Sequence, residues 1–385
     1  MGQALRSVRR PGVLLLCVVA LLGAVLGGCA ARHPAPAAPE PAAPAEYDEA
    51  TFARKEIPSY TLKVPREGRP SETVIGMSRS YTIRPGDTLL DVARLYDLGY
   101  NEIIDANPGV DPWIPHPGTT VVLPTEWVLP CCSYQGIVIN IPEMRLYYYK
   151  RSKQHPELAT IYTYPVGLGR DDRRTPRGKF NVSGKTVNPQ WNIPESIRRE
   201  HIRERDDARG FIRGGAPDNP LGKYRLELGR SLYSIHGTDI PWGVGMEVSH
   251  GCTRLYPEDI ERLFPLVPIG TPVELTYQPV KVGTRGGGTY VEVHRDIYRY
   301  ERSLYRSARA AIDRQKEPTR PVDAKLVEAA VKQAQGIPVR VSSPRSGAAR
   351  LSRASDADRR SSDVRQDVLG ESAHRSVTGE GEDHL

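Results

Sequence analysis

Long apolar segments are nearly absent from this chain of 385 residues. The mean hydropathy is −0.46, and only one run, Val13 to Leu26, is apolar enough to enter a bilayer. The run is shorter than the roughly 20 residues of a spanning helix. It follows the basic residues Arg6, Arg9 and Arg10 and precedes small residues, which is the form of a secretory signal. The sequence therefore predicts an exported protein from which residues 1–28 are removed as a signal peptide.

Cysteine is also scarce, with five residues in the whole chain. Cys17 lies inside the apolar run and Cys29 directly follows the small residues after it, which leaves Cys131, Cys132 and Cys252. In an oxidising compartment an even set would suggest a disulfide framework, whereas an odd set leaves one thiol to explain. If the adjacent pair Cys131 and Cys132 is oxidised together or is idle, Cys252 stays free.

Positive charge is not concentrated in a way that indicates nucleic-acid binding. The formal net charge is +7, and three arginines lie in the segment predicted to be removed. No basic patch interleaved with aromatic residues accompanies the surplus. We therefore expect no nucleic-acid partner, and a mild basic surplus suits an anionic wall or membrane surface.

The end of the apolar run carries a possible lipid attachment site. Leu26-Gly27-Gly28-Cys29 resembles the lipobox of bacterial lipoproteins, in which cleavage precedes the cysteine and the cysteine is lipidated. The next residue, Ala30 rather than aspartate, resembles that of outer-membrane cargo. The resemblance implies a periplasmic protein anchored to a membrane through Cys29, more readily the outer than the inner membrane. The alternative is an ordinary cleaved signal with an incidental cysteine.

The rest of the chain divides into five segments by composition. Residues 29–79 begin with an alanine- and proline-rich run and are predicted to be an extended tether. Residues 80–124 and 135–277 have the patterning of folded domains. Residues 278–335 are predicted to be an extension with a strand and helices, because a strand-like TYVEVH precedes DIYRYERSLYRSARAAIDRQ. Residues 336–385 contain few apolar residues and are predicted to be a disordered tail.

The segment 80–124 is predicted to have the order βααβ. After a short strand, Thr88 and Asp91 have the spacing of a helix cap, and a second helix over 101–106 ends before Pro108. The runs YTIRPGDTLLDVA, IIDANPGVDPW and PGTTVVLP resemble a LysM module. The resemblance implies binding to the glycan strands of peptidoglycan. The alternative is a module that only packs on its neighbour.

The segment 135–277 is predicted to be mainly β. A hairpin is expected from Gly136 to Tyr149, with one helix over 257–264. Further strands are expected at 160–166, 178–182, 224–228 and 232–236. A charged insertion over 188–222 interrupts this pattern, and its mixed charges are typical of a solvated helical face. A segment of this length beside catalytic strands could alternatively serve as a lid or substrate wall.

Cys252 is the candidate nucleophile. A thiol that transfers acyl groups needs a partner that accepts its proton and backbone N–H groups aimed at the developing oxyanion. His236 ends an apolar strand upstream, and Gly251 lets the backbone turn tightly before the cysteine. A zinc site is the rival interpretation, but two histidines and one cysteine do not make a set of four ligands. A buried inert cysteine is the other alternative on these residues alone.

The motifs around these residues resemble a known enzyme family. Ile235-His236-Gly237-Thr238 followed by the run 249–255, SHGCTRL, matches the signature of the YkuD-type L,D-transpeptidases. Flanking runs at 136–140, 175–180 and 219–222 match the ErfK/YbiS subfamily, which also carries a LysM unit. The resemblance implies a multidomain protein with a YkuD-like β-sandwich, a short helix and a LysM module, without cofactor or metal.

The resemblance also implies a role for each residue of the motif. Cys252 would attack the carbonyl before the terminal D-Ala of a tetrapeptide stem and form a thioester. His236 would act as base and then as acid, with the carbonyl of Gly237 orienting its ring. One departure is Thr253, which stands where the family usually has an aliphatic residue and is expected to point to the core.

The residues next to the cysteine would support the acyl transfer. The amides of Gly251 and Cys252, with that of His250, would form the oxyanion hole. Arg254 and Ser249 would position the loop or an acidic stem carboxylate. The acceptor stays open: a stem amine, giving a 3–3 cross-link, a lysine of an outer-membrane lipoprotein, or water, which would make a carboxypeptidase. A wall-binding lipoprotein without activity is the remaining alternative.

Overall fold

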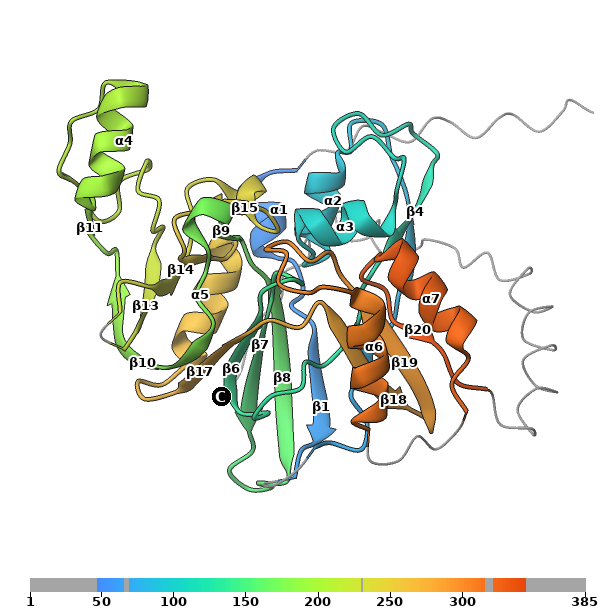
Figure 1. Ribbon diagram of the computed structural model, residues 1–385. Coiled ribbons are helices and arrows are strands. Elements are labelled where there is room, and N and C mark those ends of the chain that lie inside the picture. The colour runs from blue at the N-terminus through green and yellow to red at the C-terminus, as the bar shows by residue number, and fades with distance from the viewer. Residues whose placement is uncertain (1–46, 66–68, 230, 316–320, 344–385) are drawn as a thin grey trace, which may run out of the picture. The chain divides into compact units, whose positions relative to one another are not determined.

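The computed structural model describes residues 47–65, 69–229, 231–315 and 321–343 (Figure 1). The predicted signal peptide, the anchor Cys29 and most of the predicted disordered tail lie outside the described residues. Within the described part, no helix is both long and apolar enough to cross a membrane.

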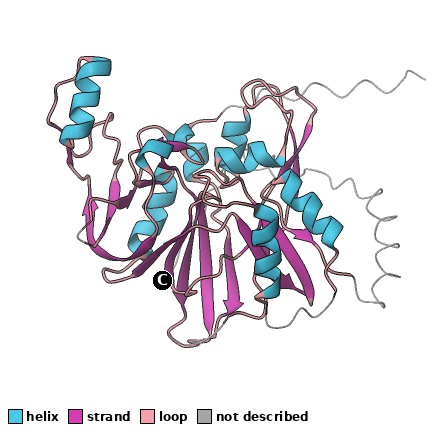
Figure 2. Ribbon diagram, viewed as in Figure 1, coloured by secondary structure: helices cyan, strands magenta, loops and turns pink. Residues whose placement is uncertain are grey.

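Most of the chain's regular structure is β (Figure 2), as expected from the sequence. The main sheet has nine strands in the order β1-β8-β7-β6-β17-β10-β13-β14-β16. Neighbours are antiparallel except the pairs β6/β17 and β14/β16, which are parallel. The strands are β1 Ser59–Lys63, β6 Gly136–Asn140, β7 Arg145–Arg151, β8 Leu158–Pro165, β10 Gly178–Val187, β13 Tyr224–Leu228, β14 Ser234–His236, β16 Thr253–Arg254 and β17 Pro272–Thr276.

Strand β6 and the first five residues of β7 are buried on both faces. Ile137 and Ile139 enter one hydrophobic core together with helix α5, Pro257–Leu266. Val138, between them on the strand, enters a second core that includes the LysM helices. Successive side chains of a strand point to opposite faces, so these cores lie on either side of the same sheet. This explains why Ile137, Val138 and Ile139 are all apolar instead of alternating with polar residues.

The LysM module has the predicted order. It comprises β3 Arg79–Thr82, α2 Leu89–Leu95, α3 Tyr100–Ala106 and β4 Thr120–Leu123. Thr88 is the N-cap of α2, and its Oγ1 accepts a hydrogen bond from the N–H of Asp91 at 3.1 Å. The module shares its core with the main sheet, so it packs on its neighbour as well as carrying the LysM pattern.

The prediction of a tether over 29–79 is wrong for its second half. Helix α1, Glu49–Ala53, and strands β1 and β2, Val74–Gly76, lie in this range. Strand β1 extends the main sheet by pairing with β8, and β2 pairs with β5, Glu126–Val128. The alanine and proline content is concentrated before residue 47, whereas the following residues have apolar positions that a sheet edge can bury.

The C-terminal extension forms a small unit with its own core. It contains the hairpin β18 Val280–Arg285 and β19 Gly288–Val293, helices α6 Leu304–Asp313 and α7 Ala324–Gln333, and β20 Val339–Arg340. The helix expected from Asp296 begins only at Leu304, because Tyr298 in the preceding loop is buried against the catalytic domain. The prediction of disorder is wrong for residues 339–341, because β20 pairs with β19 and Val341 is buried.

The insertion forms a separate lobe, at the upper left of Figure 1. Strands β11 Trp191–Asn192 and β12 Phe211–Ile212 pair with each other, and helix α4, Glu195–Arg205, lies between them in sequence. Three buried isoleucines form its small core: Ile193, Ile197 and Ile212. The helical face expected in this insertion is confined to α4, which ends where Asp206 adopts a left-handed conformation.

Candidate active site

Two parallel strands bring the predicted cysteine and histidine to one place. In the pairing of β14 with β16, His236 lies opposite Arg254. By the same register Cys252, which precedes β16, lies opposite Ser234. The Sγ atom of Cys252 is 3.8 Å from Oγ of Ser234 and 3.9 Å from the carbonyl oxygen of Leu232. Alternate residues of a strand share a face, so Cys252 is on the face of the sheet that also carries His236.

His236 is buried, with 2 % of its surface exposed. Its Nδ1 atom is 2.7 Å from the carbonyl oxygen of Gly237. A carbonyl can only accept a hydrogen bond, so Nδ1 carries the proton and Nε2 of the neutral ring is an acceptor. Burial, followed by the positive charge of Arg254, lowers the pKa of His236 to about 3. His236 is therefore a neutral imidazole at neutral pH, the form that can accept a proton.

Ser249 holds the loop that carries the cysteine. Its Oγ accepts a hydrogen bond from the N–H of Gly251 at 3.0 Å and donates one to the carbonyl oxygen of Cys252 at 2.7 Å. Gly251 has φ +106°, and a Cβ atom there would lie 2.8 Å from the ring of Tyr233. Only glycine fits this turn without strain. The conformation of the backbone before Cys252 therefore depends on the hydrogen bonds of Ser249 and on a glycine at position 251.

The three amides predicted for an oxyanion hole are not equivalent in this structure. The N–H of Gly251 points back to Ser249 and donates to its Oγ. Among the described residues, none of the hydrogen bonds uses the N–H of His250 or of Cys252. Two of the three predicted donors are therefore free to bind an oxyanion in this conformation, whereas that of Gly251 is occupied.

Arg254 and Ser249, predicted together, are placed differently. Ser249 is buried and engaged with the loop, as described above. The guanidinium of Arg254 forms no ion pair with a carboxylate in the part of the chain that the structure describes, and its buried Nε has no hydrogen-bond partner. A guanidinium that has no ion pair and lies next to the thiol can bind a carboxylate of the substrate. Thr253 is buried, as expected.

Helix α4 of the insertion contacts the loop through a cluster of three charged or ionisable groups that the sequence did not indicate. Nε2 of His250 is 3.1 Å from Oε2 of Glu200 and 3.3 Å from Nη2 of Arg170, and Arg170 lies 3.3 Å from Glu200. Because guanidinium only donates and carboxylate only accepts, Nε2 cannot bond both, and the shorter contact favours donation to Glu200. The hydrogen bond with His250 lowers the pKa of Glu200 below its usual range. The expected solvated face holds for most of α4, but not for Glu200.

The C-terminal extension also supports the segment that packs against Gly251. The hydroxyl of Tyr298 donates to the carbonyl oxygen of Gly169 at 2.7 Å and accepts from the N–H of Thr175 at 3.2 Å. Gly169, in β9 Leu168–Gly169, approaches Gly251 so closely that a Cβ atom would lie 2.9 Å from the Cα of Gly251. Motif spacing could not reveal this support, because Tyr298 lies outside the catalytic domain in sequence.

One buried cluster has the side chains of a metal site. Ligand atoms of Glu143, Glu292 and His294 lie within 4.8 Å of one another. The ammonium of Lys281 is 2.7 Å from Glu143 and 2.8 Å from Glu292. Lys281 therefore already supplies the positive charge that these carboxylates need, and the cluster joins the C-terminal extension to the turn after β6.

The family comparisons agree with this site and its neighbour. The L,D-transpeptidase catalytic domain (YkuD) matches residues 134–275, and the LysM domain matches residues 81–124. The probable L,D-transpeptidase ErfK/SrfK of Escherichia coli strain K12 is 36% identical over 307 residues, which cover 76% of this chain and 94% of that protein.

Two further relatives from the same strain show the same likeness. The probable L,D-transpeptidase YbiS is 35% identical over 292 residues, covering 74% of this chain and 92% of that protein. The probable L,D-transpeptidase YcfS is 35% identical over 230 residues, covering 58% and 70%. The chain therefore belongs to the YkuD-type L,D-transpeptidase family, and it is an L,D-transpeptidase with a LysM module.

Proposed function

We propose that the enzyme transfers acyl groups of peptidoglycan stem peptides through Cys252. The observation that carries this proposal is the placement of its Sγ on the face of the sheet that carries His236, a neutral imidazole whose Nδ1 is fixed by Gly237. His236 takes the thiol proton as sulfur attacks the carbonyl before the terminal D-Ala. The C–N bond then breaks, the proton passes to the leaving amine, D-Ala departs and a thioester remains.

The surrounding groups have distinct parts in this proposal. The N–H groups of Cys252 and His250 bind the oxyanion, since neither donates a hydrogen bond to another described residue. Ser249 is a positioning residue that holds the loop. Arg254 binds a carboxylate of the stem peptide, because its buried Nε has no hydrogen-bond partner and Asp239 acts on the guanidinium only through its charge. The amide of Gly251 joins the oxyanion hole only if the Ser249 hydroxyl turns away.

The acceptor we propose is an amine, either on a second stem peptide, which gives a 3–3 cross-link, or on a lysine of an outer-membrane lipoprotein. The LysM module supports a substrate on the glycan strand, and the lipobox ending at Cys29 supports a periplasmic enzyme anchored to a membrane, the outer membrane in preference to the inner. Hydrolysis of the thioester would instead make a carboxypeptidase on the same site.

Product analysis separates these acceptors. The protein is incubated with disaccharide-tetrapeptide, with and without an equal concentration of a lysine-ending peptide, and the products are identified by mass spectrometry. We expect D-Ala release together with a tetrapeptide–tripeptide dimer or a lysine conjugate. Tripeptide as the sole product in both mixtures would overturn the amine acceptor and assign the enzyme to hydrolysis.

A further inference from the structure

One face of the main sheet carries an arginine on each side of His236. In the register of the sheet, Arg225 on β13 lies opposite His236 on β14, and His236 lies opposite Arg254 on β16. Directly opposed residues of neighbouring strands point to the same face, and the strands are about 4.8 Å apart. The three side chains therefore form one row with the histidine in the middle, and Cys252 lies on the same face, just before Arg254 along the chain.

The opposite face of these strands is closed. Leu226 on β13 and Ile235 on β14, which alternate with the residues of the row, are buried in the core together with Ile260 and Leu263 of helix α5. A substrate therefore approaches these strands from the face that carries the two arginines.

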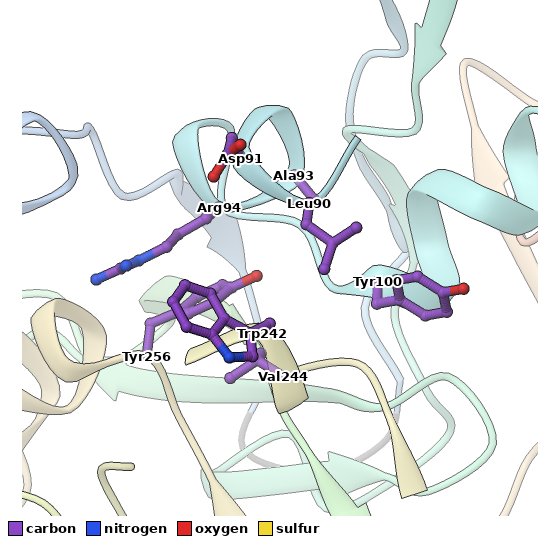
Figure 3. Close-up of a pocket in the computed structure, with 8 residues that line it drawn as sticks. All are labelled: Leu90, Asp91, Ala93, Arg94, Tyr100, Trp242, Val244 and Tyr256. Atoms are coloured by element: carbon purple, nitrogen blue, oxygen red, sulfur yellow. The ribbon is translucent and has the colours of Figure 1, made fainter. Parts of the chain in front are cut away.

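The LysM module closes the far side of the catalytic loop, the loop that joins His236 to Cys252. The N–H of Tyr100, at the start of α3, donates to the carbonyl oxygen of Val244 in this loop at 3.1 Å. The hollow that remains at this contact (Figure 3) has a volume of about 20 Å³, which is room for about one water molecule. A peptide chain does not fit on that side of the loop.

Arg225 has no partner for its charge. Among the residues that the structure describes, no hydrogen bond or ion pair uses its guanidinium, although the Nε atom is buried. The acid next to it on this face of β13, Glu227, pairs with Gly184 on β10, and a Cβ atom added there would lie 2.6 Å from its Oε2. A buried donor without an acceptor has lost its water without compensation. An anionic ligand would supply the missing acceptor.

Two other arginines near the catalytic loop already have acidic partners. Arg94, which lines the hollow of Figure 3, is bonded to both Glu49 and Glu258 at 2.7–3.0 Å. Arg170 lies 3.3 Å from Glu200. Neither guanidinium is available to a substrate carboxylate in the way that the guanidinium of Arg225 is.

The thiol and the imidazole determine which carboxylate each arginine of the row can meet. The acyl part of the donor becomes bonded to Cys252, on the side of His236 that also carries Arg254. The leaving amine takes its proton from His236 and therefore lies at the ring. In an α-amino acid the amine and the carboxylate are attached to the same carbon. The carboxylate of the leaving residue can thus lie just beyond the ring, on the side of Arg225.

We propose that Arg225 binds the terminal carboxylate of the amino acid that leaves the donor stem, while Arg254 binds a carboxylate on the acyl part. The Nε and one Nη atom of Arg225 donate to the two carboxylate oxygens as a fork. This inference rests on the proposed function and names the residue that selects a donor with a free carboxylate directly after the scissile bond.

Binding without turnover separates the two arginines. The affinity of Cys252→Ala for the disaccharide-tetrapeptide and for its C-terminal amide is measured by calorimetry, alone and combined with Arg225→Gln, Arg225→Lys or Arg254→Gln. We expect the acid to bind roughly 30-fold more tightly than the amide. Arg225→Gln should abolish this preference, and its retained binding of the amide shows that the variant is folded. Arg225→Lys should keep part of the preference, because the charge remains and the fork is lost.

The remaining variants are controls for position and for charge. Arg254→Gln should weaken the acid and the amide alike and leave their ratio unchanged, because it acts on the acyl part. Arg199→Gln removes an exposed arginine of α4 that is paired with Glu195, and it should leave both affinities unchanged.

Two results would overturn the role of Arg225. One is an acid-to-amide ratio that is unchanged in Arg225→Gln, and the other is a ratio lost in Arg254→Gln alone. Release of the terminal residue is measured with Cys252 intact. Binding that prefers the acid through Arg225, without any release, contradicts the proposed function and leaves the carboxylate site intact. Release with an unchanged ratio in Arg225→Gln does the reverse.

Discussion

The LysM module and the insertion both reach the catalytic loop, but different forces hold them. The LysM contact includes a fully buried ion pair, in which Arg145 Nε lies 2.8 Å from Glu102, and Trp127 also donates to Glu102 at 3.0 Å. The insertion has its own small core and meets the loop through Glu200, whose pair with Arg170 is partly exposed. The comparison indicates that the LysM module is a fixed part of the enzyme, whereas the insertion is a wall that can move at low energetic cost.

Breaking the buried ion pair between Arg145 and Glu102 should have the largest effect on the stability of the protein. Glu102→Gln leaves the guanidinium of Arg145 without its carboxylate, which costs about 3–5 kcal/mol when the charge is buried. The midpoint of urea unfolding should fall accordingly. Glu204→Gln on α4 is the matched control, because its partner Arg203 is exposed, and it should change stability by less than about 0.5 kcal/mol. Equal effects of the two substitutions would remove the distinction between the contacts.

The main-chain contact between the LysM module and the loop can be broken separately. Gly245→Ala forces a positive φ on alanine and places its Cβ against the nitrogen of Tyr100, which together should cost about 3 kcal/mol. D-Ala release should fall with it, since the loop leads to Cys252. Gly118→Ala, with a similar φ and open space around the Cβ, should cost only the backbone strain of about 1 kcal/mol and leave turnover unchanged.

The buried histidine makes stability depend on pH. The folded pKa of His236 is about 3, and the unfolded value is about 6.5. Between these values the unfolded chain binds a proton that the folded chain does not, so stability falls as the pH is lowered from about 6.5 toward 3. By pH 5 the loss should be about 2 kcal/mol. Unfolding of His236→Gln should lack this part of the pH dependence, and an identical slope in the variant would show that another group is responsible.

Loosening the insertion should have the smallest effect. Glu200→Gln weakens the contact with His250 and Arg170, and pairs of this exposure contribute about 0.2–1 kcal/mol. The rate of D-Ala release should fall by no more than about fivefold, and wild-type activity should show part of the same loss at high salt. Glu195→Gln, on the outer face of α4, is the control. A loss of a hundredfold would mean that Glu200 takes part in the chemistry.

The comparison also explains what the sequence could predict. Apolar periodicity located most strands and the LysM helices, because each of those segments shows its buried face within a few residues. The motif spacing indicated Cys252 and His236, and period-two alternation on β14 would have added Ser234. Glu200 and Arg145 gave no such signal, because their partners lie far away in the chain and are brought near by the packing of helices α4 and α3. The strand β1 was missed because the proline-rich run before it dominated the composition of its segment.

Cys252 should be the residue that carries the acyl group during transfer. Wild-type protein, Cys252→Ala and the control Cys132→Ala, which removes another free thiol, are incubated with disaccharide-tetrapeptide, and D-Ala and acylated protein are quantified by mass spectrometry. We expect D-Ala release and a thioester adduct in wild type and Cys132→Ala, and neither in Cys252→Ala. Undiminished D-Ala release by Cys252→Ala, with the protein folded, would contradict this role of Cys252.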